Sequence, residues 1–186
     1  MVLMIVFDLH KKTATYSDYL KTPEGAKYQL IGGEIIEMPS PTLYHQRIVT
    51  RLSRKIGNFI LDNSLGEVFV APLDVYFSDI ETYQPDIFVL LNESLSKMKA
   101  KNVEGAPDLI VEVLSPSTAF YDLNHKKSIY EKFGVKEYWI VDQDLKTIEL
   151  LENENGKYFK VSEFIATDIL QSKLFQDLKI QLLEVF

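Results

Sequence analysis

The sequence predicts a protein of the α/β or α+β class, with a mixed central β-sheet that is flanked by helices and extended by hairpins near both ends. Two observations predict this class. Short apolar runs alternate with helical stretches, and Gly-Gly and Asn-Gly pairs stand where hairpin turns are expected. A chain of 186 residues, 46% of them hydrophobic, suits a single domain over residues 1–186.

The first elements are a short helix near Thr15–Leu20 and a hairpin over Tyr28–Met38, with Gly32-Gly33 as its two-residue turn. Ser40 and Pro41 are expected to open the longest helix, because serine caps helices and proline fits the first helical position. One apolar face follows at helical spacing: His45, Ile48, Val49, Leu52, Ile56, Phe59 and Ile60. Asn63 and Gly66 mark its end.

Five short apolar runs then predict strands. A helical stretch over Asp122–Phe133, closed by Gly134, separates the third run from the fourth, which predicts a strand–helix–strand crossover. Asn155-Gly156 marks a hairpin between the last run and Tyr158–Val161. The runs are Val68–Val75, Asp86–Leu91, Asp108–Leu114, Tyr138–Val141 and Ile148–Leu151.

The composition excludes several classes of function. The chain has no Cys, so it forms no disulfide scaffold, no thiolate metal site and no Cys nucleophile. Its net charge of −7 argues against coating nucleic acid by bulk charge, although a local basic patch can still bind it. Charged residues interrupt every apolar stretch, and the apolar start Met1–Phe7 lacks a basic leader. A cytoplasmic protein without a membrane partner is therefore expected.

Two carboxylates stand where strands are expected to be apolar. Asp86 follows Pro85 at the head of one strand, and Glu112 lies inside another. Burying an ionised carboxylate costs several kcal/mol unless it is paired, protonated or bound to a metal. A divalent cation such as Mg²⁺ would offset that cost, and so would a strand-end role for Asp86 with a buried Lys or Arg beside Glu112. Asp108 is about 13 Å from Glu112 along a strand, too far to share one ion, and is expected to bond loop backbone.

An ordered series of segments over roughly Thr15–Leu151 resembles a bacterial family of restriction-endonuclease-like proteins, whose fold belongs to the PD-(D/E)XK nuclease superfamily. The resemblance rests on Leu30–Glu34, His45, Tyr83–Ile87, Gly105–Thr118, Asp122, Lys126, Tyr130 and Gly134–Asp142. It implies a restriction-endonuclease-like fold and a nuclease site.

The resemblance implies that Asp86 and Glu112 hold Mg²⁺ or Mn²⁺. The superfamily pattern places a lysine two residues after the second acid, where this chain has Leu114, and Lys126 on the following helix is the matching position. An ordinary solvated Asp122–Lys126 pair is the alternative interpretation of that lysine. Glu34 and His45 are supporting candidates in the same pattern, with an exposed turn acid and a core histidine as their alternatives.

The expected partner is nucleic acid, in the first place DNA, and a homodimer is expected by analogy with nucleases that cut both strands. Two groups of cations are candidates for phosphate contacts, with a solvated surface as the alternative. They are Arg47, Arg51, Arg54 and Lys55 on the long helix, and Lys97, Lys99 and Lys101 in a loop.

Three functions remain open. The leading hypothesis is a Mg²⁺-dependent endonuclease in which Asp86 and Glu112 hold the ion and Lys126 assists the attacking water. The second is a nuclease-fold protein that binds nucleic acid or another partner without turnover, as Leu114 and the negative charge would suit. The third is a metal-dependent hydrolase of another substrate, because fold alone does not fix chemistry.

Overall fold

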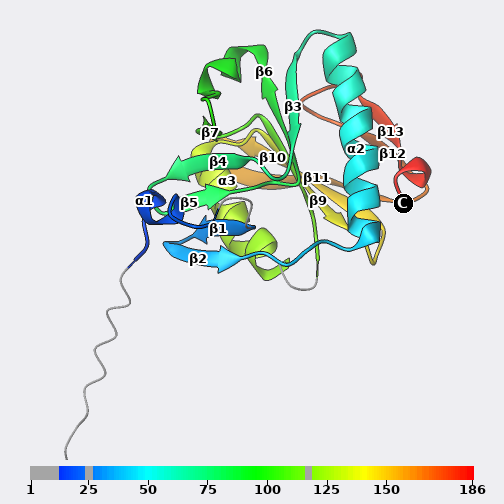
Figure 1. The fold of residues 1–186 in the computed structure, drawn as a ribbon. Coiled ribbons are helices and arrows are strands. Elements are labelled where there is room, and N and C mark those ends of the chain that lie inside the picture. Colours follow the sequence, from blue (N-terminus) through cyan, green and yellow to red (C-terminus); the bar gives the residue numbers. More distant parts are fainter. Residues whose placement is uncertain (1–12, 24–26, 116–118) are drawn as a thin grey trace, which may run out of the picture.

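The computed structural model describes residues 13–23, 27–115 and 119–186, and two mixed sheets dominate it (Figure 1). The apolar start Met1–Phe7 and residues 116–118 of the family-like segment lie outside the described residues. None of the helices in the described ranges is long and apolar enough to cross a membrane.

The chain enters through α1 (Tyr16–Tyr19) and the hairpin of β1 (Tyr28–Ile31) and β2 (Glu34–Glu37), as the turn signal predicts. Gly32 and Gly33 have φ of +58° and +76°, the left-handed conformation of both residues in this turn class. A Cβ at Gly33 would lie 2.1 Å from Thr13 Cγ2, so close approach also requires glycine there.

The long helix, α2, spans Leu43–Asp62 and starts two residues later than its sequence signals suggest. The Thr42 hydroxyl, and not that of Ser40, accepts a hydrogen bond from the His45 amide at 3.1 Å and caps the helix. Ser40 and Pro41 therefore stay outside the helix, where they line a pocket. The predicted apolar face is confirmed: its buried members are His45, Ile48, Val49, Leu52, Ile56 and Ile60.

The larger sheet has six strands in the order β11-β10-β9-β8-β6-β3. Their bounds are β3 Gly66–Val70, β6 Ile87–Leu91, β8 Leu109–Val113, β9 Glu137–Asp142, β10 Thr147–Glu154 and β11 Lys157–Ile165. β8 and β9 are parallel and all other neighbours are antiparallel, so the sheet is mixed and the predicted crossover is confirmed. The Asn155-Gly156 turn joins β10 and β11 as expected.

The smaller sheet has five strands in the order β2-β1-β5-β4-β7, and it corrects one sequence prediction. The run Val68–Val75 is not one strand: its first part is β3 in the larger sheet, and its last part begins β4 (Asp74–Ser78) in the smaller one. Pro72 lies at this break, where it has no N–H to continue a ladder. β5 (Glu81–Tyr83) and β7 (Asn102–Glu104) have three residues each and were not expected.

The crossover helix has two parts: η2 (Tyr121–Lys126), with π-helical turns, and α3 (Lys127–Phe133), which ends at Gly134 with φ of +83°. A 3₁₀ segment, η1 (Asn92–Lys97), follows β6. The chain closes with β12 (Ile169–Gln171), β13 (Lys179–Gln181) and η3 (Leu182–Glu184), which sequence analysis did not predict and which pack beside α2 (Figure 1).

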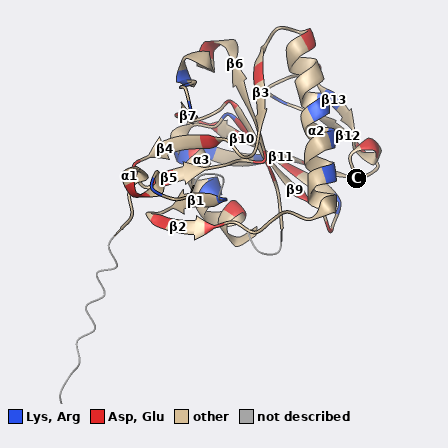
Figure 2. Ribbon diagram, viewed as in Figure 1, with Lys and Arg blue, Asp and Glu red and all other residues tan. Residues whose placement is uncertain are grey.

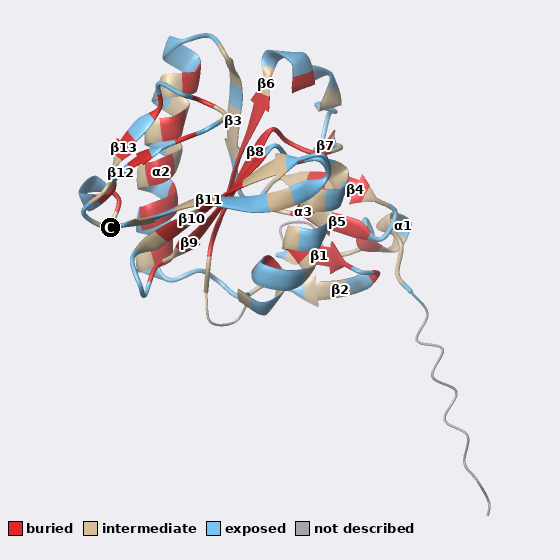
Figure 3. Ribbon diagram, turned by 180° about the vertical axis from the view of Figure 1, so that it is seen from behind, coloured by how far each residue is buried: buried red, intermediate tan, exposed pale blue. Residues whose placement is uncertain are grey.

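The inner strands β6, β8 and β9 of the larger sheet are buried on both faces, as their apolar sequences predict (Figure 3). One face packs against α2 and the closing segment through residues that include Val111, Val113 and Trp139. The other face packs against the smaller sheet and α3 through Ile110 and Tyr138, among others. Because side chains alternate along β8, Glu112 shares this second face with Ile110.

Candidate active site

The two strand carboxylates lie opposite each other at one end of β6 and β8. Ile87 is paired with Val111, so antiparallel register places Asp86 across from Glu112. The Val113 amide donates to Asp86 Oδ2 at 2.8 Å and fixes that side chain at the strand end. Both carboxylates line a pocket of about 320 Å³. The predicted pair is thus brought together by strand pairing alone.

Lys126 reaches the same place from the crossover helix. Its Nζ lies 3.1 Å from Glu112 Oε1 and 2.8 Å from Asp122 Oδ1, and all three side chains are 3–4% exposed. The Asp122–Lys126 pair is therefore buried, and the interpretation as a solvated helix pair is wrong. The Nζ also lies 5.9 Å from the centre of the Tyr83 ring, a contact with the ring face that favours a cation.

Tyr130, which sequence analysis names in the family resemblance without a role, adds a contact to the site. It is fully buried one turn after Lys126, and its hydroxyl donates to Glu112 Oε1 at 2.7 Å. Both described contacts of Glu112 thus use Oε1. Tyr130 and Lys126 together hold the carboxylate at a fixed orientation on its strand.

The charges in this cluster determine which groups keep their protons. Burial lowers the pKa of Lys126, but the carboxylates of Glu112 and Asp122 outweigh it and raise the pKa above its ordinary value. Burial raises the pKa of Glu112 to about 7; Lys126 opposes this rise, and the charges of Asp122 and Asp86 add to it. Two carboxylates pair with the Lys126 ammonium ion, so the lysine stays charged, and the nearby charges of Asp122 and Asp86 favour a proton on Glu112.

His45, in the first turn of α2, contacts Asp86 and the backbone of β8. Its Nε2 is 3.0 Å from the Val113 carbonyl oxygen and 3.3 Å from Asp86 Oδ2. Burial opposes protonation, but the hydrogen bond and charge of Asp86, the Val113 carbonyl and the charge of Glu112 together outweigh it and raise the pKa of His45. Sequence analysis named His45 as a supporting candidate, and the structure brings it into contact with the first of the two acids.

Two other acids lie away from this cluster. Glu34 is exposed at the start of β2 and does not appear among the described residues that line the pocket. Asp108 lies at the opposite end of β8 from the site, where it accepts a hydrogen bond from the Leu91 amide and pairs with Lys136, both at 2.8 Å. Asp108 thus lies at a strand end as expected, but the backbone amide that it binds belongs to the neighbouring strand β6 and not to a loop.

The buried Glu81 and the partly exposed His125 form a link that sequence analysis missed. Glu81 accepts hydrogen bonds from the Gly32 amide at 2.9 Å and from the Tyr83 hydroxyl, and it lies 3.0 Å from His125 Nε2. His125 directly precedes Lys126, so this link attaches the smaller sheet to the helix that carries the lysine. No sequence signal marks it, because its members lie in three separate segments.

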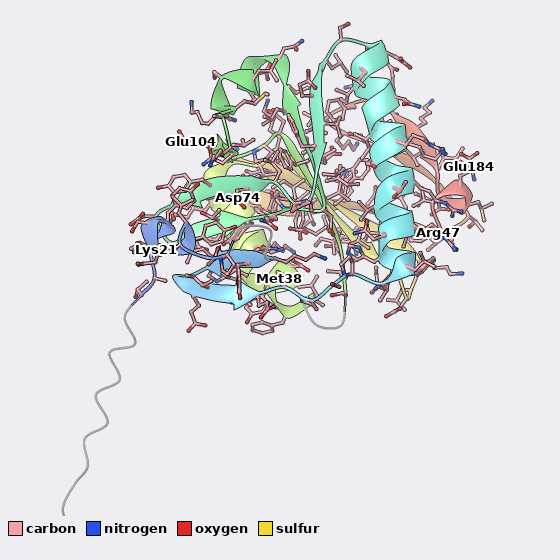
Figure 4. All side chains as sticks on the ribbon, viewed as in Figure 1. Lys21, Met38, Arg47, Asp74, Glu104 and Glu184 are labelled. Atoms are coloured by element: carbon pink, nitrogen blue, oxygen red, sulfur yellow. The ribbon has the colours of Figure 1, made fainter. Side chains whose placement is uncertain are left out.

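The basic face expected on α2 is partly occupied by the end of the chain. Arg51 donates to the Val185 carbonyl oxygen at 3.2 Å, and Lys55 pairs with Glu184. Figure 2 shows the cations along α2, and Figure 4 labels Arg47 and Glu184 on that side of the molecule. In the loop, Lys97 donates to the Ala106 carbonyl oxygen at 2.7 Å. Lys99 donates to the Ser96 carbonyl oxygen at 3.1 Å. Four of the seven candidate phosphate ligands thus have structural partners.

The donor set fits a hard divalent cation that keeps part of its water shell. Within residues 13–23, 27–115 and 119–186, no group of three or more His, Asp and Glu side chains is arranged to hold a metal. Mg²⁺, however, is commonly held by one or two carboxylates, with waters and substrate phosphate completing its shell. When Asp86, Glu112 and Asp122 are all ionised, their three negative charges exceed the single positive charge of Lys126 by two. This count leaves out His45.

The fold and this pair of strand acids define the class of the protein, which is that of proteins with a restriction-endonuclease-like fold. It matches the crystal structure described as "a putative nuclease belonging to DUF820" from Anabaena variabilis, with a TM-score of 0.76 and 22% identity, over 92% of this chain and 97% of that one.

The chain belongs to the Uma2 family, described as "Putative restriction endonuclease", whose model matches residues 14–183. Two uncharacterized proteins of Synechocystis sp. are similar to it. The protein sll1609 is 30% identical over 83% of this chain and 89% of its own length. The protein slr1290 is 28% identical over 79% of this chain and 77% of its own length. The family predicted from the motifs is thus confirmed.

Proposed function

We propose that this protein is a divalent-metal-dependent endonuclease that hydrolyses phosphodiester bonds of DNA. The observation that carries the proposal is the placement of Asp86 and Glu112 on facing strand positions with the Lys126 ammonium 3.1 Å from Glu112. Membership of a nuclease family supports the same reaction class.

Asp86 and Glu112 would hold Mg²⁺ or Mn²⁺, which when bound polarises a phosphodiester and lowers the pKa of a water molecule. The described contacts of the two acids use Asp86 Oδ2 and Glu112 Oε1, so Oδ1 and Oε2 are the oxygens we assign to the ion. His45 and the Val113 amide orient Asp86 from behind, as outer contacts do around metal ligands.

Lys126 would stabilise the negative charge that develops on the phosphorus oxygens and orient the attacking water. Its raised pKa keeps it charged, and Asp122 holds it beside Glu112. Leu114 occupies the usual lysine position of the superfamily pattern. Lys126 on η2 would take the place of that strand lysine, because the crossover brings η2 back alongside β8.

The direct test is relaxation of supercoiled plasmid DNA by the purified protein with Mg²⁺ or Mn²⁺, and with EDTA as the metal-free control. Cleavage that requires the ion and is lost in Glu112→Gln supports the proposal. The exposed Glu154 provides a matched control, and Glu154→Gln should cleave like the unchanged protein. Cleavage that persists in Glu112→Gln would contradict the assignment.

One observation favours a second function, a nuclease-fold protein that binds without turnover: Lys126 already pairs with two carboxylates in the absence of substrate. This alternative predicts no Mn²⁺ binding in calorimetry and no cleavage. Clear binding of Mn²⁺ that Asp86→Ala abolishes would reject it.

Metal affinity is expected to depend on pH through Glu112. Its pKa of about 7 means that the carboxylate must lose a proton before it can hold a cation, so Mn²⁺ affinity should fall about tenfold from pH 8 to pH 6. The stability of the metal-free protein is expected to change with pH in the opposite direction to its Mn²⁺ affinity. The folded state binds this proton more tightly than the unfolded chain, so the stabilising contribution is present below pH 4.5 and is lost as the pH rises through 7. Calorimetric titration at several pH values measures the first effect, and a flat profile would contradict it.

Replacing His45 with alanine should weaken metal binding about 10- to 100-fold, because Asp86 loses an orienting partner. The expected readout is Mn²⁺ affinity by calorimetry, with Gln46→Ala, the next residue of α2, as the control. Equal affinities in His45→Ala and the unchanged protein would show that the Val113 amide alone fixes Asp86.

A further inference from the structure

The groups assigned to chemistry line a pocket, and most of their side-chain surface is buried. The side chains of Glu112, Asp122 and Lys126 are 3–4% exposed, and that of Asp86 is 19% exposed. The pocket holds about 320 Å³, close to the lower end of the range of about 300–1,000 Å³ for pockets that enclose a small ligand. Its volume therefore suits one nucleotide unit.

A continuous DNA duplex does not place a single nucleotide inside a pocket. DNA bends smoothly only over about 150 base pairs, and its phosphates stay on the surface of a stiff rod. Nucleotides reach enclosed sites when the strand is single or when one residue turns out of the stack. Burial of the reactive groups thus selects against uninterrupted duplex.

Some of the cations expected to bind a duplex also have other partners. Arg51 and Lys55 hold the last residues of the chain to α2. Phosphate contacts along a duplex require such groups to be available. This observation is independent of the pocket and points to the same conclusion.

The pocket wall includes a polar side chain whose acceptor is unpaired within the described part of the chain. Gln29, on β1, is 6% exposed, and its Oε1 is buried with no hydrogen-bond partner among the described residues. Such an unpaired acceptor costs free energy and calls for an explanation. A side-chain amide can accept from the exocyclic amino group of a base. Met38, Pro39 and Pro72 line the same pocket and offer apolar surface to a base or sugar; Figure 4 labels Met38.

We infer that the pocket takes a nucleotide from a single-stranded or unpaired segment of DNA, with its phosphate toward Asp86 and Glu112 and its base toward Gln29. The inference rests on the proposed function and narrows its substrate to strands that are not continuously paired. Gaps, overhangs and bulges in a duplex present such nucleotides.

The test compares three labelled oligonucleotides of one sequence: single-stranded, fully paired, and paired with a bulge of three unpaired nucleotides. Cleavage is followed with Mn²⁺, and binding is followed by fluorescence anisotropy with Ca²⁺. Single-stranded and bulged DNA should be cut and bound at least tenfold better than the duplex. Equal rates and affinities for the duplex would overturn the inference.

If no DNA is cut, the proposed function fails, but the binding measurement still tests the inference. A tenfold preference for binding unpaired DNA would support the inference, and the absence of that preference would overturn it. Gln29→Leu should weaken single-strand binding about tenfold without changing Mn²⁺ affinity. Gln171→Leu, at an exposed position on β12, is the matched control. Unchanged single-strand binding in a folded Gln29→Leu variant would overturn the assignment of Gln29.

Discussion

Replacing Lys126 with methionine is expected to reduce phosphodiester cleavage about 100- to 1,000-fold, the usual effect of removing a group that stabilises transition-state charge. Methionine preserves the length and apolar stem of the side chain and removes only the ammonium group. Metal binding should persist, because Asp86 and Glu112 are unchanged. Rates of plasmid nicking under saturating Mn²⁺ measure the effect.

The same substitution should also destabilise the protein, because Glu112 and Asp122 lose their buried counterion. Breaking a buried ion pair by removing one partner typically costs about 3–5 kcal/mol. Lys127→Met is the matched control, since Lys127 is only half-buried and adjacent in the chain. Asp122→Asn combined with Lys126→Met should recover part of the stability and none of the activity. Recovery of cleavage in that double variant would contradict the proposed role of the lysine.

Replacing Glu137 with alanine is expected to give the largest loss of stability outside the site, about 3–4 kcal/mol. This carboxylate is fully buried at the start of β9 and accepts four hydrogen bonds, three of them from the segment that leads from β12 to β13. The four donors, at 2.6–2.9 Å, are Trp139 Nε1, Ser172 Oγ and the amides of Lys173 and Leu174. Its loss leaves buried donors unsatisfied and frees this segment from the sheet.

Denaturant unfolding monitored at Trp139 measures the loss, because the indole is itself a partner of Glu137. Glu154→Ala, at the exposed end of β10, should change stability by less than about 0.5 kcal/mol. Equal stabilities of the two variants would show that the closing segment is held by its apolar contacts alone.

Local patterns were sufficient to predict much of this fold. The Gly32-Gly33 and Asn155-Gly156 turns, the apolar face of α2 and the crossover between β8 and β9 follow from conformational preference and periodicity. The same reasoning placed two acids at corresponding strand depths, and strand register then brings Asp86 opposite Glu112. The catalytic roles of these acids and of Lys126 remain predictions.

Contacts between distant segments account for what the sequence did not predict. Three-residue strands such as β5 and β7 are too short to show an alternation of apolar and polar residues, so little in the sequence indicated the smaller sheet. The roles of Arg51 and Lys55 depend on the closing segment, more than 120 residues further along the chain. Gln29 is an ordinary strand residue in sequence, and only the pocket around it makes it notable.

The burial of β8 on both faces has a consequence for attempts to alter substrate choice. Glu112 shares its strand with Val111 and Val113, which pack against the α2 side of the sheet, so mutations in that core should shift the acid as well as destabilise the protein. In the pocket wall, Pro39 and Pro72 belong to neither core, and Met38 packs only at the edge of one as a partly buried residue. Libraries that diversify these loop positions should therefore yield folded variants with new preferences, whereas libraries in the strands should yield mostly inactive ones.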